Sequence, residues 1–309
     1  MQKGLTIIIL FLSFKITFSQ QFTDLYGEYL GQIPPGDSSV VFAPGIISSD
    51  YAEHCAPAFS PDGNEVFWWV CMIPGSGDEK WISKGMTMKR IGNRWTSPTV
   101  SPYYGEVFFS SDGKRLYFAG LYPDHKGDGP YMVEKENDKW SEPKNLGLVA
   151  RFPELKKVMC PSVTQNGTLY FAGDIVGQSM SEDIRIYRSK LIDGEYTNLE
   201  LLPPSINLPD TWNGTPFIAP DESYLIFNSK RESNGDGDLF ISFHNLDTDT
   251  WSEPVTMDIP GERYPGLSPD GKYFFFTRFT RFSPPVYDND IFWISAEIID
   301  KLRDKSVEK

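Results

Sequence analysis

A short alternation of hydrophobic stretches and polar turns recurs along most of the chain. The phrase FSPDGNEVFWW at 59–69 returns as FSSDGKRLYFAG at 109, VTQNGTLYFAG at 163, IAPDESYLIFNS at 218 and LSPDGKYFFFTR at 267. When the copies are aligned on their turn residues, the steps are 50, 54, 55 and 49 residues; these residues are Asp62, Asp112, Asn166, Asp221 and Asp270. Each copy predicts strand, tight turn, strand, because Asp or Asn with Gly suits the turn and β-branched or aromatic residues follow it. The fourth copy has Glu222 in place of the glycine, so its turn is the one expected to differ.

Two further strands recur at matching distances from each turn. The third is predicted at KWISK (80), YMVEK (131), DIRIYRS (183), DLFISF (238) and DIFWIS (290). The fourth begins with an aromatic residue, at RWTSP (94), KWSEP (139), EYTNL (195) and TWSEP (250). Four strands in roughly fifty residues, repeated, are typical of a β-propeller blade. The sequence therefore predicts an all-β fold, a single β-propeller.

The number of fourth strands predicts how the ring closes. Five copies of the first three strands are present but only four of the fourth, and the chain ends soon after the last third strand. The segment SSVVFAPG, about 38–45, can supply the missing strand to the last blade, and such closure removes exposed strand edges. We therefore expect five four-stranded blades within a domain over 20–309, with a degenerate sixth blade left open as the alternative.

The repeat phrase resembles that of a known family. Residues 57–68 and 265–276 preserve best a pattern x-P-x-[FL]-S-P-D-G-x-x-[LV]-[YF]-F, which resembles the PD40 or WD40-like repeat of TolB-type propellers. The stretch YLGQIPPGDSSVVFAPGIIS at 29–48 is similar to the opening of exported PD40 proteins of Bacteroidetes. The resemblance implies a propeller that serves as a binding platform, as a scaffold for an enzyme or as an accessory to an envelope complex. TolB-type propellers have six blades, so the count of five departs from that pattern.

The N-terminus predicts export. A lysine at position 3 precedes an apolar run, Leu5 to Phe14, and a small residue, Ser19, follows. This is the pattern of a secretory signal peptide, here 1–19, and the run is too short to span a bilayer comfortably. We expect an exported protein, periplasmic or secreted, that does not span the membrane.

Charge narrows the range of partners. The formal net charge of −13 argues against nucleic acid or an anionic membrane surface, both of which select basic patches. No phosphate-binding loop, G-x-S-x-G elbow or H-E-x-x-H metal motif is present, so no cofactor is expected.

Three cysteines are an odd number for an exported chain. Cys55 and Cys71 lie almost symmetrically about the turn at Asp62, so a hairpin would place them roughly opposite each other. A cross-strand disulfide is one interpretation and two buried free thiols are the other. Cys160 has no evident partner, and the spacings fit no zinc pattern.

The carboxylates of the repeated turns favour a structural interpretation. Asp caps the turn through its own backbone and Gly permits a positive φ, so neither needs a catalytic role. A weak calcium candidate remains at Asn234, Asp236 and Asp238, which alternate as ligands in a calcium loop do, although the completing glutamate is absent.

Positions that differ between copies are better candidates for a ligand site. They lie where each first strand begins, near the expected mouth of the central channel; the binding candidates are Glu53, His54, Tyr104, Glu106, Lys157, Trp212, Asn213, Arg263 and Tyr264. Carboxylates, cations and aromatic faces together suit a polar small molecule, a glycan or a peptide. We expect a platform that binds such a ligand or an envelope protein without catalysis.

A carbohydrate-active enzyme is the alternative. A glycosidase needs two carboxyl groups at a fixed separation, and a polysaccharide lyase can use histidine, tyrosine and arginine. The candidate catalytic residues are His54, Glu106 and Glu262, with Tyr104 and Arg263 as further lyase candidates. None of them lies in a diagnostic motif.

Overall fold

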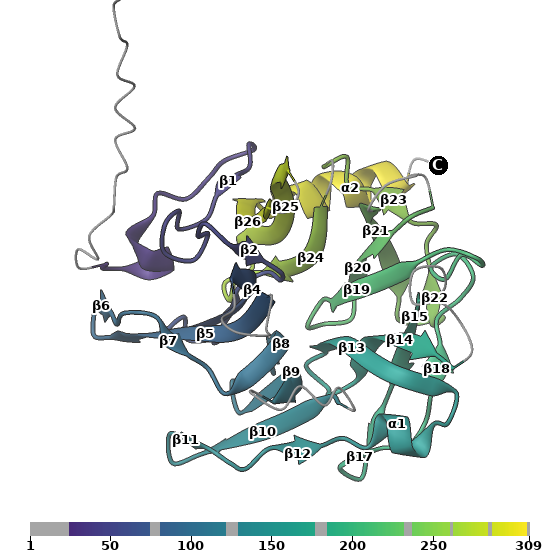
Figure 1. Cartoon of the computed structure of the whole chain (residues 1–309). Helices are drawn as coiled ribbons and strands as arrows, with labels where there is room; N and C mark the ends of the chain where they lie inside the picture. Colours follow the sequence, from purple (N-terminus) through teal and green to yellow (C-terminus); the bar gives the residue numbers. More distant parts are fainter. Residues whose placement is uncertain are drawn as a thin grey trace, which may run out of the picture.

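Antiparallel sheets stand in a ring around a central axis in the computed structural model of the chain (Figure 1). The structure describes residues 25–74, 81–121, 129–176, 184–231, 237–259, 262–283 and 286–307. The predicted signal peptide lies outside the described residues. The sheets form five blades of a β-propeller, so the predicted fold class and blade number are confirmed.

Each blade begins with its innermost strand and continues outward. Blade 1 contains β2 (Ala52–Glu53), β3 (Ala58–Phe59), β4 (Glu65–Pro74), β5 (Trp81–Ile91), β6 (Arg94–Trp95) and β7 (Thr99–Val100). Blade 2 contains β8 (Tyr103–Phe109), β9 (Arg115–Leu121), β10 (Tyr131–Glu136), β11 (Lys139–Trp140) and β12 (Lys144–Asn145). Blade 3 follows the short helix α1 (Leu148–Arg151) and contains β13 (Leu155–Val163), β14 (Leu169–Ile175), β15 (Ile184–Ser189) and β18 (Glu200–Leu201), with the small hairpin of β16 (Leu191–Ile192) and β17 (Glu195–Tyr196).

The last two blades complete the ring. Blade 4 contains β19 (Asn213–Ile218), β20 (Tyr224–Ser229), β21 (Asp238–Asn245), β22 (Thr250–Trp251) and β23 (Val255–Thr256). Blade 5 contains β24 (Glu262–Leu267), β25 (Tyr273–Ser283), β26 (Val286–Ser295) and β1 (Val40–Val41). The 3-10 turn η1 (Glu28–Gly31) precedes β1, and the helix α2 (Glu297–Val307) follows β26. Among the described residues no helix is long and apolar enough to cross a membrane.

The N-terminal strand closes the ring as predicted. Val40 pairs with Trp293 and Val41 with Phe292 of β26, and the Phe42 amide donates to the Ile291 carbonyl at 2.8 Å. Figure 1 shows this purple segment beside the yellow strands of blade 5. The last blade thus takes its outermost strand from the start of the domain.

The predicted fourth strand is divided in two. In blade 1, β6 pairs with the end of β5 and carries the aromatic residue of the repeat, Trp95, whose indole nitrogen donates to the Gly27 carbonyl at 2.8 Å. After Pro98 the chain forms β7, which pairs further back along β5. The aromatic residue therefore belongs to a short hairpin, and the edge strand of the blade follows the proline, which has no N–H to donate to a ladder.

The consecutive aromatic residues of the repeats pack between blades. Trp68 lies in one cluster with Phe42 and Phe275 of blade 5, whereas the adjacent Phe67 lies in another with Phe109 of blade 2. Successive side chains on a strand point to opposite faces, and in a propeller each face meets a neighbouring blade. Trp68 and Phe67 are therefore core side chains on opposite faces of blade 1.

The turn of blade 4 has the same backbone conformation as the others despite lacking glycine. Glu222 has a φ of 63°, close to the 66° of Gly63 and the 72° of Gly271 at the corresponding positions. The Asp221 carboxylate accepts the Ser223 amide at 3.1 Å, as Asp62 accepts the amide two residues after it. The expectation that this turn differs is therefore wrong for its backbone, and the difference lies in what the extra side chain contacts.

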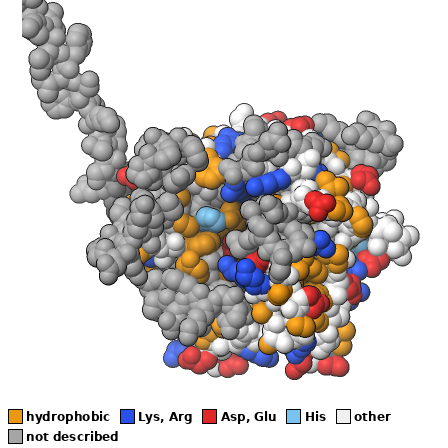
Figure 2. Space-filling model, turned by 45° about the vertical axis from the view of Figure 1, so that its right-hand side comes forward, with side chains coloured by type: hydrophobic (Ala, Val, Ile, Leu, Met, Phe, Trp, Pro, Cys, Tyr) orange, Lys and Arg blue, Asp and Glu red, His pale blue; other side chains and the backbone are white. Residues whose placement is uncertain are grey.

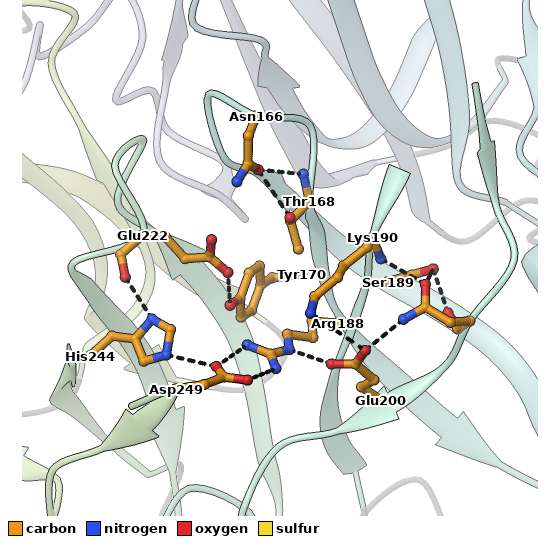
Figure 3. Close-up of polar contacts among 11 residues, drawn as sticks. Asn166, Thr168, Tyr170, Arg188, Ser189, Lys190, Glu200, Glu222, His244 and Asp249 are labelled. Carbon is orange, nitrogen blue, oxygen red and sulfur yellow. Dashed lines mark hydrogen bonds and ion pairs between the residues drawn. The ribbon is translucent and has the colours of Figure 1, made fainter. Parts of the chain in front are cut away.

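A polar network joins blades 3 and 4 at this turn (Figure 3). The Tyr170 hydroxyl of β14 donates to Glu222 Oε1 at 2.5 Å, and the two ring nitrogens of His244 lie 3.1 Å from the Glu222 carbonyl and 3.0 Å from Asp249. Arg188 donates to both oxygens of Asp249 at 2.8 and 2.7 Å. Side chains of two blades are thereby bonded across their interface.

Candidate functional site

A break in strand pairing recurs in the innermost strands, where the repeats differ most in sequence. The register with the neighbouring strand shifts between Tyr104 and Val107, Met159 and Ser162, Gly214 and Phe217, and Arg263 and Gly266. One residue in each break has a positive φ: 81° at Gly105, 51° at Cys160, 48° at Thr215 and 52° at Tyr264. Such bulges bend a strand and re-aim its side chains, here at the channel axis.

Proline residues account for the position of these breaks. Pro161, Pro216 and Pro265 each follow the residue with positive φ, and Pro57 lies between β2 and β3 in blade 1. Proline has no backbone N–H, so a ladder cannot continue through it without losing a hydrogen bond. The break is thus encoded five residues before each turn in four of the five copies.

The bulges enclose a cavity of about 540 Å³ on the channel axis. Residues of the breaks line its inner end, and exposed residues of the repeated turns form its rim: Pro61, Ser111, Pro220 and Pro269. The cavity therefore opens at the end of the channel where the turns lie. Phe108 of blade 2 and Phe217 of blade 4 line its wall, with ring centroids 6.0 Å apart although blade 3 separates them in the ring.

Glu106, Cys160 and Tyr264 line the inner end of the cavity. Burial raises the pKa of the Glu106 carboxyl, which is opposed by hydrogen bonds that include one from the Cys160 thiol and by the charge of Lys157. Burial, followed by the charge of Glu106, raises the pKa of the Cys160 thiol and of the Tyr264 hydroxyl. An acid, a thiol and a phenol thus meet at one point on the axis, and burial disfavours the charged form of each.

His54 lies next to this layer, where the first strands begin. Its ring centroid is 4.7 Å from that of Trp69 and 4.6 Å from that of Tyr264, and the Tyr264 hydroxyl is 3.3 Å from Nε2. Burial, then the charge of Arg263, lowers the pKa of His54 to about 4, so the imidazole is neutral at pH values near 7. Its Nδ1 has no hydrogen-bond partner among the described residues.

The structure brings six of the nine predicted binding residues together around the axis. They are linked by ring contacts and by mutual electrostatic effects: His54, Tyr104, Glu106, Lys157, Arg263 and Tyr264. Tyr104 contacts the group through Trp69, whose ring centroid lies 4.9 Å from its own. On the face drawn in Figure 2, Lys and Arg side chains and hydrophobic ones lie together near the middle of the surface.

The other three predicted binding residues have structural contacts instead. The buried Glu53 accepts hydrogen bonds from the Ser49 amide and hydroxyl at 3.2 and 2.7 Å. Asn213 is buried and accepts the Ser229 hydroxyl at 2.8 Å. Trp212 packs across Gly214, leaving no room for a Cβ there.

Glu262, a candidate catalytic residue, pairs through its backbone with Arg278, and its side chain lies outside what the structure describes.

Of the two alternatives for Cys55 and Cys71, the structure has the buried free thiols and not the cross-strand disulfide, and Cys160 is free as well. Ala52, and not Cys55, lies opposite Cys71. The pairing of β3 with β4 places Ala58 opposite Phe67, but the break at 54–57 shifts the register beyond it. A symmetric hairpin was therefore the wrong basis for the disulfide.

The calcium candidate stays a prediction, because the structure describes only one of its three residues. Asn234 and Asp236 lie outside the described residues, and Asp238 begins β21 opposite Ser229. In the described part of the chain, no three His, Cys, Asp or Glu side chains are grouped to hold a metal ion.

The repeated turn carboxylates act as caps. At Asp270, burial alone would raise the pKa, but hydrogen bonds from Ser268, Lys272 and Tyr29 lower it to about 2. In two other turns the serine two residues earlier likewise donates its hydroxyl to the carboxylate, at 2.5 Å to Asp62 and at 2.6 Å to Asp112. These contacts support the structural interpretation of the turns.

The cavity at the turn end is the feature that sequence reasoning missed. The proline five residues before the turn in four of the five copies marks the cavity, but its effect becomes apparent only when five strands surround one axis.

Comparisons with known proteins identify no family. No family model and no curated protein matches the chain. Among solved structures, similar ones include a GH43_12 protein retrieved from a capybara gut metagenome (14% identity, TM-score 0.49, 87% of this chain and 55% of that one). Others are an α-L-arabinofuranosidase from Lactobacillus brevis (13%, 0.47, 80% and 93%) and the Dos1 propeller (10%, 0.41, 82% and 71%). The chain thus spans about half the length of the GH43_12 protein, and these distant likenesses assign no activity to it.

Proposed function

We propose that this protein is an exported ligand-binding β-propeller that holds a small molecule in its axial cavity without catalysing a reaction there. The cavity of about 540 Å³ is the observation that carries the proposal. Sites for small molecules are typically concave, mostly apolar, roughly 300 to 1,000 Å³ in volume and supplied with a few convergent polar groups. Apolar walls with Glu106, Cys160 and Tyr264 at the inner end have this character.

The cavity offers a poor site for glycoside hydrolysis. That reaction needs two carboxyl groups, about 5 to 10 Å apart, that are available to the substrate. The acidic residues known to line the cavity are Glu106, Asp221 and Asp270. The last two cap turns, where each accepts a backbone amide and a hydroxyl, so Glu106 alone is uncommitted to a turn.

A lyase at the end of the channel where the first strands begin is the second candidate, and the neutral His54 is the observation that favours it. A neutral imidazole could take the proton from the carbon beside a uronate carboxylate, and Arg263 could neutralise that carboxylate. The Tyr264 hydroxyl, 3.3 Å from Nε2, could then protonate the leaving oxygen as the double bond forms.

The remaining features of the proposal rest on sequence patterns. The signal-peptide pattern supports export to the periplasm or beyond, and the SPDG phrases support membership of the PD40 or TolB-like propellers. A glycan or an envelope protein as partner also stays a prediction.

A cavity-filling variant tests the binding proposal. Val107 lines the cavity, whereas Val100 is 49% exposed on the edge strand β7 and serves as the matched control. Thermal-shift screening of a metabolite library should give compounds that stabilise the wild type and Val100→Trp but not Val107→Trp. Failure to find any, or compounds that act equally on all three proteins, would contradict the proposal.

The lyase candidate has its own test. Incubation with a panel of uronate polysaccharides should produce unsaturated ends if the His54 mouth is catalytic, and His54→Asn should abolish them. Absence of cleavage across the panel would leave the binding function as the sole candidate.

A further inference from the structure

The cavity lining contains acids but, among the described residues, no base. Glu106 lies at the inner end and Asp221 and Asp270 lie at the rim, whereas no Lys, Arg or His side chain is part of the wall. Lys157 acts electrostatically on Glu106 and Arg263 on Tyr264, but neither cation is among the described residues that line the cavity. In a site of low dielectric constant such an imbalance favours a positively charged ligand and disfavours an anion.

The backbone of the wall reinforces this preference. Pro57, Pro161, Pro216 and Pro265 line the cavity, and none of them has an N–H group. Anion sites in proteins are commonly built from convergent backbone N–H groups or basic side chains. The bulges of this propeller thus remove donors at the very positions that approach the axis.

Several polar side chains of the wall are acceptors or can accept. Besides the Glu106 carboxyl, the wall includes Thr215, which is 3% exposed and whose hydroxyl oxygen has no hydrogen-bond partner among the described residues. A ligand with N–H donors could bond to the Thr215 hydroxyl and to the Glu106 carboxyl, which also accepts a hydrogen bond from the Cys160 thiol. Phe108 and Phe217 also line the cavity with apolar surface, and aromatic rings of this kind attract cations to their faces.

We propose that the axial cavity binds an organic cation, with an ammonium group paired to Glu106 and an apolar body against Phe108 and Phe217. This inference rests on the proposed function, since it names the class of ligand that the same cavity takes. A cation in the cavity beside the half-buried Glu106 favours the ionised carboxylate that burial alone disfavours, and its N–H groups meet the acceptors of the wall. The apolar body replaces water along the phenylalanine and proline surface.

Three ligands of nearly equal shape but different charge test whether the cavity prefers a cation. Isothermal titration at pH values near 7 compares 2-phenylethylamine, which is cationic, with neutral 2-phenylethanol and anionic phenylacetate. We expect the amine to bind at least about tenfold more tightly than the alcohol, equivalent to about 1.4 kcal/mol, and phenylacetate to bind most weakly. Glu106→Gln should remove most of the advantage of the amine and leave the alcohol nearly unchanged. Glu134→Gln, a matched change at an exposed residue paired with Arg115, should alter neither.

The outcomes separate this inference from the proposed function. Equal affinity for amine and alcohol, abolished for both by Val107→Trp, would overturn the cation but keep the cavity as a binding site. Tightest binding of phenylacetate would overturn the inference by reversing the sign of the charge. Lack of binding by all three at millimolar concentrations would also overturn it, while the library screen decides the proposed function independently. If Glu106→Gln fails to fold, the three ligands compared on the wild type still decide whether the cavity prefers a cation.

Discussion

The Tyr170 hydroxyl of blade 3 donates a 2.5 Å hydrogen bond to Glu222 in the turn of blade 4, at the position where the other four turns have glycine. Glu222 keeps the left-handed conformation of those glycines, with a φ of 63°. A non-glycine residue there is strained, at a cost of the order of 1 kcal/mol or more. The bond to Tyr170 compensates for this strain by joining two blades.

Two substitutions at Glu222 separate the strain from the hydrogen bond. Glu222→Ala loses the bond but keeps the strain, so we expect the free energy of unfolding to fall by about 1 to 3 kcal/mol. Glu222→Gly also loses the bond but relieves the strain, and should be more stable than the alanine variant by about 1 kcal/mol. Urea denaturation measures both. Gly271→Ala is the control, since it introduces the same strain in blade 5 without any change of hydrogen bonds. Equal stability of the two Glu222 variants would show that the backbone there is unstrained.

Arg188 holds two carboxylates at the interface of blades 3 and 4, with 2.7 Å bonds to Glu200 and to Asp249. Its side chain is 11% exposed, and its removal takes the guanidinium from both acids, which remain partly in water and keep their contacts with His244 and Asn198. Arg188→Leu should therefore lower the free energy of unfolding by about 1 to 3 kcal/mol, less than for a fully buried pair. Arg115→Leu, which breaks the exposed pair with Glu134, should cost less than about 1 kcal/mol. Comparable losses in the two variants would contradict the assignment of Arg188 as an inter-blade contact.

The dependence of the free energy of unfolding on pH should reveal the contribution of the Asp270 turn cap. Hydrogen bonds lower the pKa of this carboxyl to about 2, below its ordinary value of about 4. A depressed pKa contributes stability that is present above the ordinary value and is lost as the pH falls through the folded-state value. Part of the stability of the wild type should thus disappear between about pH 4 and pH 2.

The Tyr29 hydroxyl supplies one of those hydrogen bonds, at 2.8 Å. Tyr29→Phe should make the loss of stability over the same pH interval shallower, because the pKa of Asp270 moves back towards its ordinary value. Chemical denaturation at several pH values measures the slope. An unchanged slope in Tyr29→Phe would show that Ser268 and Lys272 alone lower the pKa of Asp270.

The period of the repeat and its turns could be predicted because they depend on local chemistry. Asp62 with Gly63 specifies a turn wherever it occurs, and counting fourth strands was enough to assign the closing strand around Val40. The opposition of Cys55 and Cys71 could not be predicted correctly, because the break at 54–57 shifts the register between them.

The candidate site was predicted only in part, for a related reason. His54, Glu106 and Tyr264 stood out because they break the symmetry of the repeat, and the structure brings them together at the axis. The cavity beside them depends on side chains from separate blades, such as Phe108 and Phe217. Each residue looks like ordinary core within its own repeat, so only closure of the ring makes them one wall.

Ring closure itself is open to a direct test at Phe42. This residue is fully buried just after β1, and its ring centroid lies 5.1 Å from those of Phe275 and Trp293 in blade 5 and 6.0 Å from that of Phe59 in blade 1. Phe42→Ala removes the ring that joins the first and last blades and should lower the free energy of unfolding by about 3 to 5 kcal/mol. Ile33→Ala, in the same N-terminal segment but 86% exposed, should change it by less than about 0.5 kcal/mol. Because closure orders the whole ring, Phe42→Ala should also increase amide hydrogen exchange in both β26 and β4, as measured by mass spectrometry. Faster exchange confined to the N-terminal segment would show that blades 1 and 5 hold together without it.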